Sequence, residues 1–216
     1  MRKLCIRVAA SVIVILARFV TAVHARWQGT APRTAQCIYY ANHCSHGDFV
    51  LLWTVLPPVL RQRTRPVAGA DYWLTSPLRR FIGRDVFRAV LVERDRSRRD
   101  NDPIAQMSDV LDAGESLIIF PEGTRNTGES RLLPFKSGLF HLARLRPDID
   151  LVPVWISNLN RVLPKGEVIP IPLVCSVTFG APLARVAKED KKSFLSRAEL
   201  ALQSLDNGGS AAQNAS

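Results

Sequence analysis

The chain has 216 residues, 47% hydrophobic and 22% charged, and its 29 basic and 19 acidic residues give a formal charge of +10. This length and composition exclude an extended disordered chain and two large domains, since a domain typically has about 100–200 residues. Four cysteines without a Cys-x-x-Cys pair exclude a disulfide scaffold and indicate reduced thiols in the core or at the surface.

The N-terminal segment begins Met-Arg-Lys and is then apolar from Val8 to Ala17. As a helix this run reaches about 15 Å, half of the roughly 30 Å hydrocarbon core of a bilayer, so we do not expect a conventional spanning helix. With the apolar residues beyond Arg18, the segment forms a longer amphipathic helix with basic ends, which is typical of a helix that lies on an anionic membrane surface. A secretory signal peptide and a buried core helix are the alternatives.

Beyond this segment, short apolar runs alternate with stretches of helical periodicity. Asp102 is a candidate N-cap and Gly114 a candidate stop for the helix between them. The pattern predicts an α/β fold: a single domain with a largely parallel mixed sheet, covered by helices, and with its functional loops at the strand ends. The expected strands are 36–41, 67–70, 89–92, 116–120, 151–156 and 174–179, and the expected helices are 50–55, 103–113, 137–146 and 188–205.

We expect three parts along the chain. Residues 1–30 hold the N-terminal membrane-associating helix, and residues 31–205 form the single folded domain. Residues 206–216 consist largely of Asn, Gly, Ser, Ala and Gln, and should form a disordered tail.

The positive charge is concentrated between residues 61 and 100, where eleven arginines and five acidic residues give a net charge of +6. Such a stripe attracts polyanions: nucleic acid, anionic lipid headgroups or a phosphorylated small molecule. A solvated basic face that keeps the protein soluble is the alternative. Because aromatic residues do not alternate with these arginines, and no zinc-finger or RNA-binding signature is present, nucleic acid is not expected as a partner.

The first strand-to-loop junction with reactive side chains contains His43 and, five residues later, Asp48. If Ser45 caps the following helix, Asp48 stands one turn inside it and its carboxylate points back toward the imidazole. That contact fixes the tautomer and stabilises the protonated imidazole, as a general base needs when it takes a proton from an alcohol. The same spacing also occurs in inert helix caps. His46 beside His43 resembles part of a metal site, but with four histidines and no second acidic or His cluster we expect no metal.

The second junction follows an apolar strand and reads Pro121-Glu122-Gly123-Thr124-Arg125. Pro-Glu-Gly turns the chain sharply and leaves the side chains of Glu122, Thr124 and Arg125 at the sheet end. Arg125 offers a fork of donors suited to phosphate, and Gly123 lets backbone N–H groups approach a ligand closely. Glu122 either holds a neighbouring basic side chain or accepts a hydrogen bond from a substrate hydroxyl. An ordinary β-turn is the alternative.

Together these residues resemble the lysophospholipid acyltransferase family, and most closely its 1-acyl-sn-glycerol-3-phosphate acyltransferases. The resemblance rests on Asn42-His43-x4-Asp48 followed by Phe120-Pro121-Glu122-Gly123-Thr124-Arg125. Three further stretches agree. They are Val90-Leu91-Val92-Glu93-Arg94, where Ala89 replaces the family's usual Gly, then Phe135-Lys136-Ser137-Gly138, and the apolar block Val152-Pro153-Val154.

The resemblance implies that His43 is the general base that deprotonates the free hydroxyl of a lysophospholipid. That hydroxyl then attacks an acyl thioester directly, without an acyl-enzyme, and Asp48 orients and charge-stabilises His43. Arg94 and Arg125 would bind the acceptor phosphate, and Val152 to Val154 would lie near the acyl chain or support the site. The other substrate-binding candidates are Glu122, Gly123, Thr124 and Lys136.

The resemblance also implies the substrates and the location. The acceptor would be 1-acyl-sn-glycerol-3-phosphate, giving phosphatidic acid, and another lyso-lipid such as a lyso-aminolipid is the alternative. Acyl-CoA or acyl carrier protein would be the donor, with no further cofactor, and residues 31–205 would be the catalytic domain at the anionic cytoplasmic face of a membrane. A metal-dependent hydrolase and a non-catalytic basic binding module are the alternatives from other functional classes.

Overall fold

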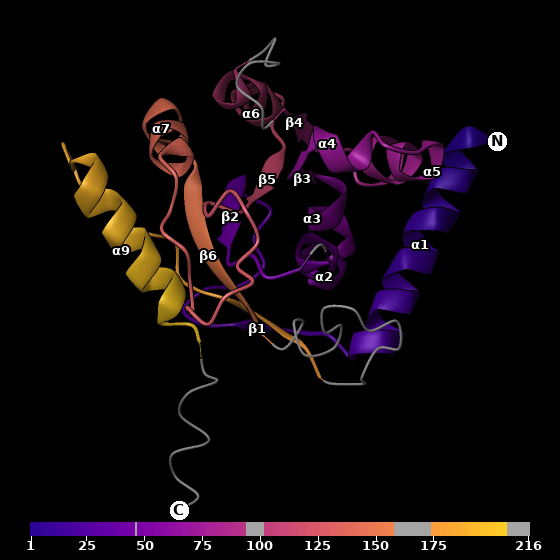
Figure 1. Ribbon diagram of the computed structural model, residues 1–216, viewed down its shortest axis with the longest axis horizontal. Coiled ribbons are helices and arrows are strands. Elements are labelled where there is room, and N and C mark those ends of the chain that lie inside the picture. Colours follow the sequence, from indigo (N-terminus) through magenta and orange to yellow (C-terminus); the bar gives the residue numbers. More distant parts are fainter. Residues whose placement is uncertain (46, 94–101, 158–173, 207–216) are drawn as a thin grey trace, which may run out of the picture.

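Seven strands form one sheet in the order β1-β7-β6-β2-β5-β3-β4 (Figure 1) within residues 1–45, 47–93, 102–157 and 174–206, the parts of the chain that this computed structural model describes. Five neighbouring strands, from β6 to β4, run parallel, β7 runs antiparallel to β6, and β1 runs parallel to β7. The predicted largely parallel α/β sheet is confirmed. The strands are β1 (His24–Trp27), β2 (Cys37–Ala41), β3 (Thr64–Gly69), β4 (Val90–Val92), β5 (Ser116–Ile119), β6 (Asp150–Ser157) and β7 (Ser176–Phe179).

Helices cover both faces of the sheet (Figure 1). The first face packs around Tyr39 and Phe179 against the N-terminal helices, and the second packs around Ile38 and Leu117 against three later helices, α6, α7 and α9. Neighbouring residues of one strand point to opposite faces, so β2 supplies both cores. The helices are α1 (Arg2–Thr21), α2 (Asp48–Val55), α3 (Pro58–Gln62), α4 (Ala70–Trp73), α5 (Pro77–Arg80), the π-helical turn η1 (Phe81–Val86), α6 (Pro103–Asp112), α7 (Gly138–Leu145) and α9 (Lys191–Gln203).

β2 and β5, in the middle of the sheet, are buried on both faces, which explains their largely apolar sequences. Every residue of β2 and β5 is buried, as expected for parallel strands between layers of helices. The helix that follows Asp102 also begins and ends as predicted. The Asp102 side chain accepts a hydrogen bond from the N–H of Ile104, and Gly114 has a φ of +77°, which glycine adopts without steric cost.

The N-terminal helix is longer than the apolar run from which we predicted it. α1 has 20 residues and contains Arg18, so the argument that the apolar run is too short to span a membrane is wrong. By length and composition α1 qualifies as a candidate span, a test that signal sequences and core helices also pass. One side of α1, including Ile13, Val14 and Ala17, packs against the core of the domain.

Several short elements lack a sequence signal. β1 lies within the first 30 residues and pairs with β7, so the sheet begins before the boundary expected at residue 31. Its Trp27 stacks on Phe179 with ring centroids 4.0 Å apart. Between β2 and β4, α3, α4, α5 and η1 each have four to six residues, too few to show a helical period.

The arginine stripe does not form one surface. Arg61 donates to three carbonyl oxygens at the end of α2, and both Arg65 and Arg88 pair with Glu115. These arginines stabilise the fold. A second group is exposed on α5 and η1, while residues 94–101 and the expected tail after residue 206 lie outside the described residues. The exposed group is Arg79, Arg80 and Arg84.

Candidate active site

The two junctions identified in the sequence meet at the carboxyl edge of the parallel strands. β2 and β5 are parallel neighbours, with Tyr40 opposite Ile119. The loops that leave these strands therefore start side by side, and the ring of His43 stacks on Phe120 with centroids 4.3 Å apart. Ligand sites of parallel α/β sheets lie beyond this edge.

His43 and Asp48 form a buried pair. Nδ1 of His43 lies 2.8 Å from Oδ2 of Asp48, and the two side chains are 12% and 1% exposed. The same Oδ2 accepts the backbone N–H groups of Cys44 and Ser45 at 2.7 and 2.8 Å. The predicted contact between carboxylate and imidazole is therefore present. Because the carboxylate holds Nδ1 as the donor, Nε2 is the ring nitrogen left to accept a proton.

The helix after this pair begins at Asp48, two residues before the expected range 50–55. Its N-cap is Gly47, so Ser45 does not cap it, and Asp48 is its first residue and does not stand one turn inside it. The carbonyl oxygen of Ser45 accepts the N–H of Asp48 in a turn before the helix. The Asp48 carboxylate then reaches back over that turn and holds it closed. His46 lies outside the described residues.

Glu122 is a buried clamp between the two loops. Its side chain is 1% exposed, Oε1 accepts the N–H of His43 at 2.7 Å, and Oε2 accepts the N–H of Leu133 at 2.9 Å. Burial raises the pKa of this carboxyl, against the two backbone donors, which lower it. Glu122 thus positions the backbone of His43 and does not line the cavity described below, which differs from the substrate contact expected from the sequence.

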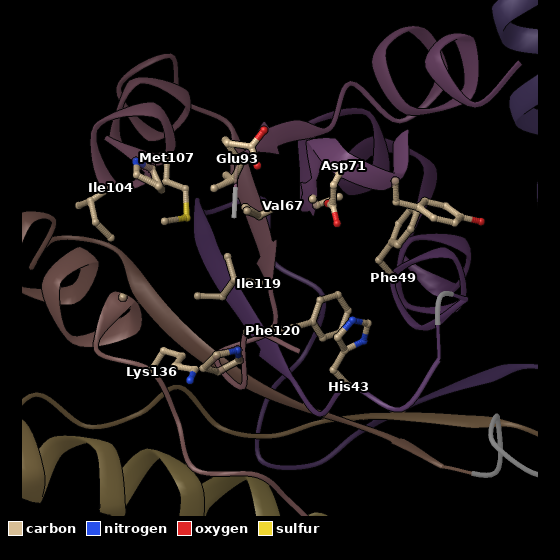
Figure 2. A pocket seen from close by; sticks show the side chains of 18 of the residues that line it. His43, Phe49, Val67, Asp71, Glu93, Ile104, Met107, Ile119, Phe120 and Lys136 are labelled. Atoms are coloured by element: carbon tan, nitrogen blue, oxygen red, sulfur yellow. The ribbon is translucent and has the colours of Figure 1, made fainter. Parts of the chain in front are cut away.

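A cavity of about 780 Å³ opens in front of His43 (Figure 2). This volume is in the range of about 300–1,000 Å³ typical of small-molecule sites. Figure 2 shows the imidazole pointing into the hollow beside Phe120, with Asp71 on the far side. One wall is apolar and comes from β3, β5 and α6. Its side chains include Val67, Ile104, Met107 and Ile119.

Two basic residues line this cavity and are exposed: Arg125, which was expected to bind the acceptor phosphate, and Lys136, a further substrate-binding candidate. Gly123 lines it as well, with a φ of +69°, and a Cβ at this position would come within 3.1 Å of Lys136 Cγ. Only glycine satisfies both constraints without strain. Thr124 is exposed but is not part of the lining. Arg94 lies outside the described residues.

Two thiols lie near the pair. Burial, with smaller contributions from the charges of Asp48 and Glu122, raises the pKa of Cys44 to about 11. Burial and the charge of Asp48 raise the pKa of Cys175 to about 11. Both thiols are therefore protonated near neutral pH, and neither is an activated nucleophile. The reactive group that the site presents is the imidazole.

Asn42 has a positioning role that sequence reasoning missed. Its Nδ2 donates to the carbonyl oxygen of Ile156 at 3.0 Å, and its Oδ1 accepts the N–H of Ile156 at 2.8 Å. The only available signal was its place before His43 in the motif.

Val152 and Val154 lie buried in β6, the strand that contains Ile156, and do not line the cavity. They therefore support the site as part of the core beneath it.

Within the part of the chain that the structure describes, no three His, Cys, Asp or Glu side chains form a group that could hold a metal ion. The wall formed by α4 and α6 was also missed, because its apolar and polar residues carry no motif. That wall completes the cavity opposite His43.

Known proteins are similar to this chain in sequence and in fold. The model of the acyltransferase family matches residues 23–157. The 1-acyl-sn-glycerol-3-phosphate acyltransferase of Salmonella typhimurium is 31% identical over 143 residues, which cover 63% of this chain and 53% of that protein. The enzyme of the same name from Limnanthes alba is 34% identical over 156 residues, 68% of this chain and 50% of that protein. The chain thus spans about half the length of the curated relatives it matches.

One solved structure has the same architecture. It is the 1-acyl-sn-glycerophosphate acyltransferase of Thermotoga maritima, with a TM-score of 0.70 and 19% identity. The superposition covers 94% of this chain and 79% of that chain. At this identity the likeness concerns the fold.

Proposed function

This chain belongs to the acyltransferase family, and from that membership we propose that it transfers an acyl chain from an acyl thioester to the free hydroxyl of a lysophospholipid. The favoured acceptor is 1-acyl-sn-glycerol-3-phosphate, with phosphatidic acid as the product, because the curated relatives carry that name. The donor is acyl-CoA or acyl carrier protein, and no further cofactor takes part. Another lyso-lipid acceptor is the second candidate.

The buried pair of His43 and Asp48 carries this proposal. Nε2 of His43 takes the proton of the acceptor hydroxyl while the hydroxyl oxygen attacks the thioester carbonyl carbon. The C–S bond then breaks, the new ester forms, and the imidazolium returns the proton to the leaving thiolate. Asp48 stabilises the imidazolium that exists between these two transfers, and the Nδ1–Oδ2 distance of 2.8 Å supports that role.

Positive charge at the cavity supports a phosphate-bearing acceptor. Arg125 and Lys136 stand beside His43 in one lining, and an arginine fork matches phosphate geometry. Arg94, from the strand block of the resemblance, is a further candidate for this phosphate. The apolar wall from β3, β5 and α6 suits the acyl chain, because burial of apolar surface against it lowers the free energy of binding.

The location follows from the substrates and from α1. A lipid acceptor and a lipid product reside in a membrane, and α1 is an exposed apolar helix with basic ends. We assign the protein to the cytoplasmic face of a membrane, where anionic lipids attract its basic residues.

An acyl-transfer assay tests the proposal. The full chain in detergent is given lysophosphatidic acid with acyl-CoA or acyl carrier protein donors, beside His43→Ala and with or without a chelator. We expect chelator-resistant transfer that His43→Ala abolishes and that His24→Ala, a histidine on β1 outside the cavity, retains. If His43→Ala retained transfer, His43 would not be the general base. If the unaltered protein acylated no lyso-lipid, the proposed reaction class would be refuted.

A further inference from the structure

A second cavity lies on the face of the sheet that α7 and α9 cover. Its volume is about 1,090 Å³, which is large for a small-molecule site. Its walls come from α7, the start of β6, residues 183–190 and the first half of α9. Figure 1 shows α7 and α9 on the side of the molecule away from α1. The second cavity shares neither His43 nor the cations beside it with the candidate active site.

The acidic side chains of the second cavity all have partners within the protein. Glu189 pairs with Arg197 at 2.6 Å, and Asp150 lies 3.7 Å from Arg185. Asp190 caps α9, where its carboxylate accepts two N–H groups of the first turn. Five basic and three acidic side chains line the cavity, so its net charge is +2. The cavity is therefore positive, and its carboxylates are already engaged.

Three basic side chains of the second cavity have no acidic partner among the residues that the structure describes. They are Arg144, Lys188 and Lys191, and all three are exposed. The guanidinium of Arg144 lies over the ring of Phe140, 5.6 Å from its centroid. An anionic ligand with a flat apolar part matches both these cations and the buried apolar floor beneath them. The floor consists of Phe140, Ile149, Leu151 and Phe194.

α7 is the wall between the second cavity and the candidate active site. His141 of this helix lines both cavities, whereas Gly138 lines only the first and Arg144 only the second. From Gly138 to Arg144 the helix advances about 9 Å, since each residue adds about 1.5 Å. A ligand held in the second cavity can therefore extend along α7 to the cavity that His43 faces.

A thioester donor has to place its carbonyl carbon beside His43 and its carrier elsewhere. The first cavity, of about 780 Å³, also has to hold the acceptor and the acyl chain, so the carrier lies outside it. We propose that the second cavity binds the nucleotide end of acyl-CoA and that the pantetheine arm runs along α7 to His43. The phosphate groups then meet Arg144, Lys188 and Lys191, and the purine lies on the apolar floor. This inference rests on the proposed function, from whose two donors it selects one.

The shape of the second cavity favours acyl-CoA over acyl carrier protein. A protein partner docks on a broad outer surface of several hundred Å², whereas these cations surround a hollow between separate parts of the chain. The acidic side chains of a carrier protein would pair with the exposed cations and leave the apolar floor empty. The nucleotide end of CoA uses both the cations and the floor, so it is the occupant that we select.

Calorimetric titration of the full chain in detergent with CoA tests the site. Lys188→Gln/Lys191→Gln should weaken binding about fivefold or more at low salt and less at high salt, because salt screens exposed charges. The matched control, Lys3→Gln/Lys192→Gln, removes two exposed lysines that line neither cavity. The control should bind CoA as the unaltered protein does. The same Kd for all three proteins, or an equal loss in the two variants, would overturn the proposal.

The choice of donor separates this proposal from the proposed function. With acyl-CoA, Lys188→Gln/Lys191→Gln should raise KM about fivefold. With an acyl thioester of N-acetylcysteamine, which has no phosphate and no nucleotide, KM should equal that of the unaltered protein. Equal slowing with both donors would overturn the nucleotide site, and so would slowing with acyl carrier protein alone, which would assign the cations to that protein. If CoA binding depends on Lys188 and Lys191 but the unaltered protein acylates no lyso-lipid from any donor, the proposed function is refuted and the site stands.

Discussion

Replacing Asp48 by Asn should remove the charge of the buried pair while leaving the imidazole held in place. Three donors meet at Oδ2 of Asp48: the N–H groups of Cys44 and Ser45, and Nδ1–H of His43. An amide NH₂ group placed there would face all three donors, so the amide oxygen of the variant takes this position. The imidazole then keeps its tautomer, and the variant isolates the contribution of the charge.

The expected loss in rate follows from that geometry. A hydrogen bond to a charged group contributes about 1.5–3 kcal/mol and a neutral one about 0.5–1.5 kcal/mol. The transition state therefore loses about 1–2 kcal/mol, which corresponds to a kcat roughly 5- to 30-fold lower. Folding also suffers, because the NH₂ group comes to the position of Oδ1, which is buried and has no hydrogen-bond partner among the described residues. A buried donor left unsatisfied costs about 1–3 kcal/mol.

The assay compares kcat at saturating substrate for the unaltered protein, Asp48→Asn, Asp48→Ala and His43→Ala, with a thermal unfolding curve for each. Asp48→Ala removes the acceptor altogether, so its rate should approach that of His43→Ala. If Asp48→Asn were as slow as Asp48→Ala, the side-chain amide would have rotated to place its NH₂ group toward the three donors, and these donors would not determine its orientation. An unchanged rate would mean that the charge does not act on the imidazolium.

Three further outcomes follow from the site. Arg125→Ala and Lys136→Ala should each raise KM for a phosphate-bearing acceptor about tenfold with little change in kcat, and KM for an acceptor without phosphate should stay constant. Burial raises the pKa of Glu122 in the folded state, so the contribution of this carboxyl to the free energy of unfolding is present at acid pH and is lost as the pH rises through that pKa. In Glu122→Gln, the free energy of unfolding, measured in urea at several pH values, should not show this decrease. The same pH dependence in both proteins would contradict the prediction. With a pKa of about 11, Cys44 should have about one thiolate in a thousand at pH 8 and react slowly with iodoacetamide until the pH exceeds about 10, whereas fast labelling at pH 8 would show that burial does not protect it.

The reactive pair was predictable because it is local. His43 and Asp48 are five residues apart, so the length of one turn limits how far their side chains can separate. The role of Glu122 was not predictable, because its carboxylate accepts the backbone N–H of His43, 79 residues away, and backbone donors leave no mark in the sequence. From the sequence we therefore expected Glu122 to contact the substrate, whereas in the structure its carboxylate accepts the backbone N–H groups of His43 and Leu133.

The elements of the fold differ in the same way. β2 and β5 have largely apolar sequences because both faces are buried, and that pattern is visible without the structure. β1 has four residues, three of them half-buried, and becomes a strand only because β7 lies beside it. Asp102 was predictable as an N-cap because Pro103, a favoured first helical residue, follows it. Ser45 is not an N-cap because the turn after it extends to Gly47, which caps the helix instead.

The pairing of β1 with β7 also sets an order of events during synthesis. At about 5–20 residues per second, the roughly 150 residues between these strands take on the order of 10 s to emerge from the ribosome. Throughout that interval β1 has no β7 to pair with, and Trp27 has no Phe179 to stack on. Such an open edge recruits other strands, so neighbouring nascent chains compete for it until β7 arrives. A chain cut short before Ser176 would keep that edge open for its lifetime.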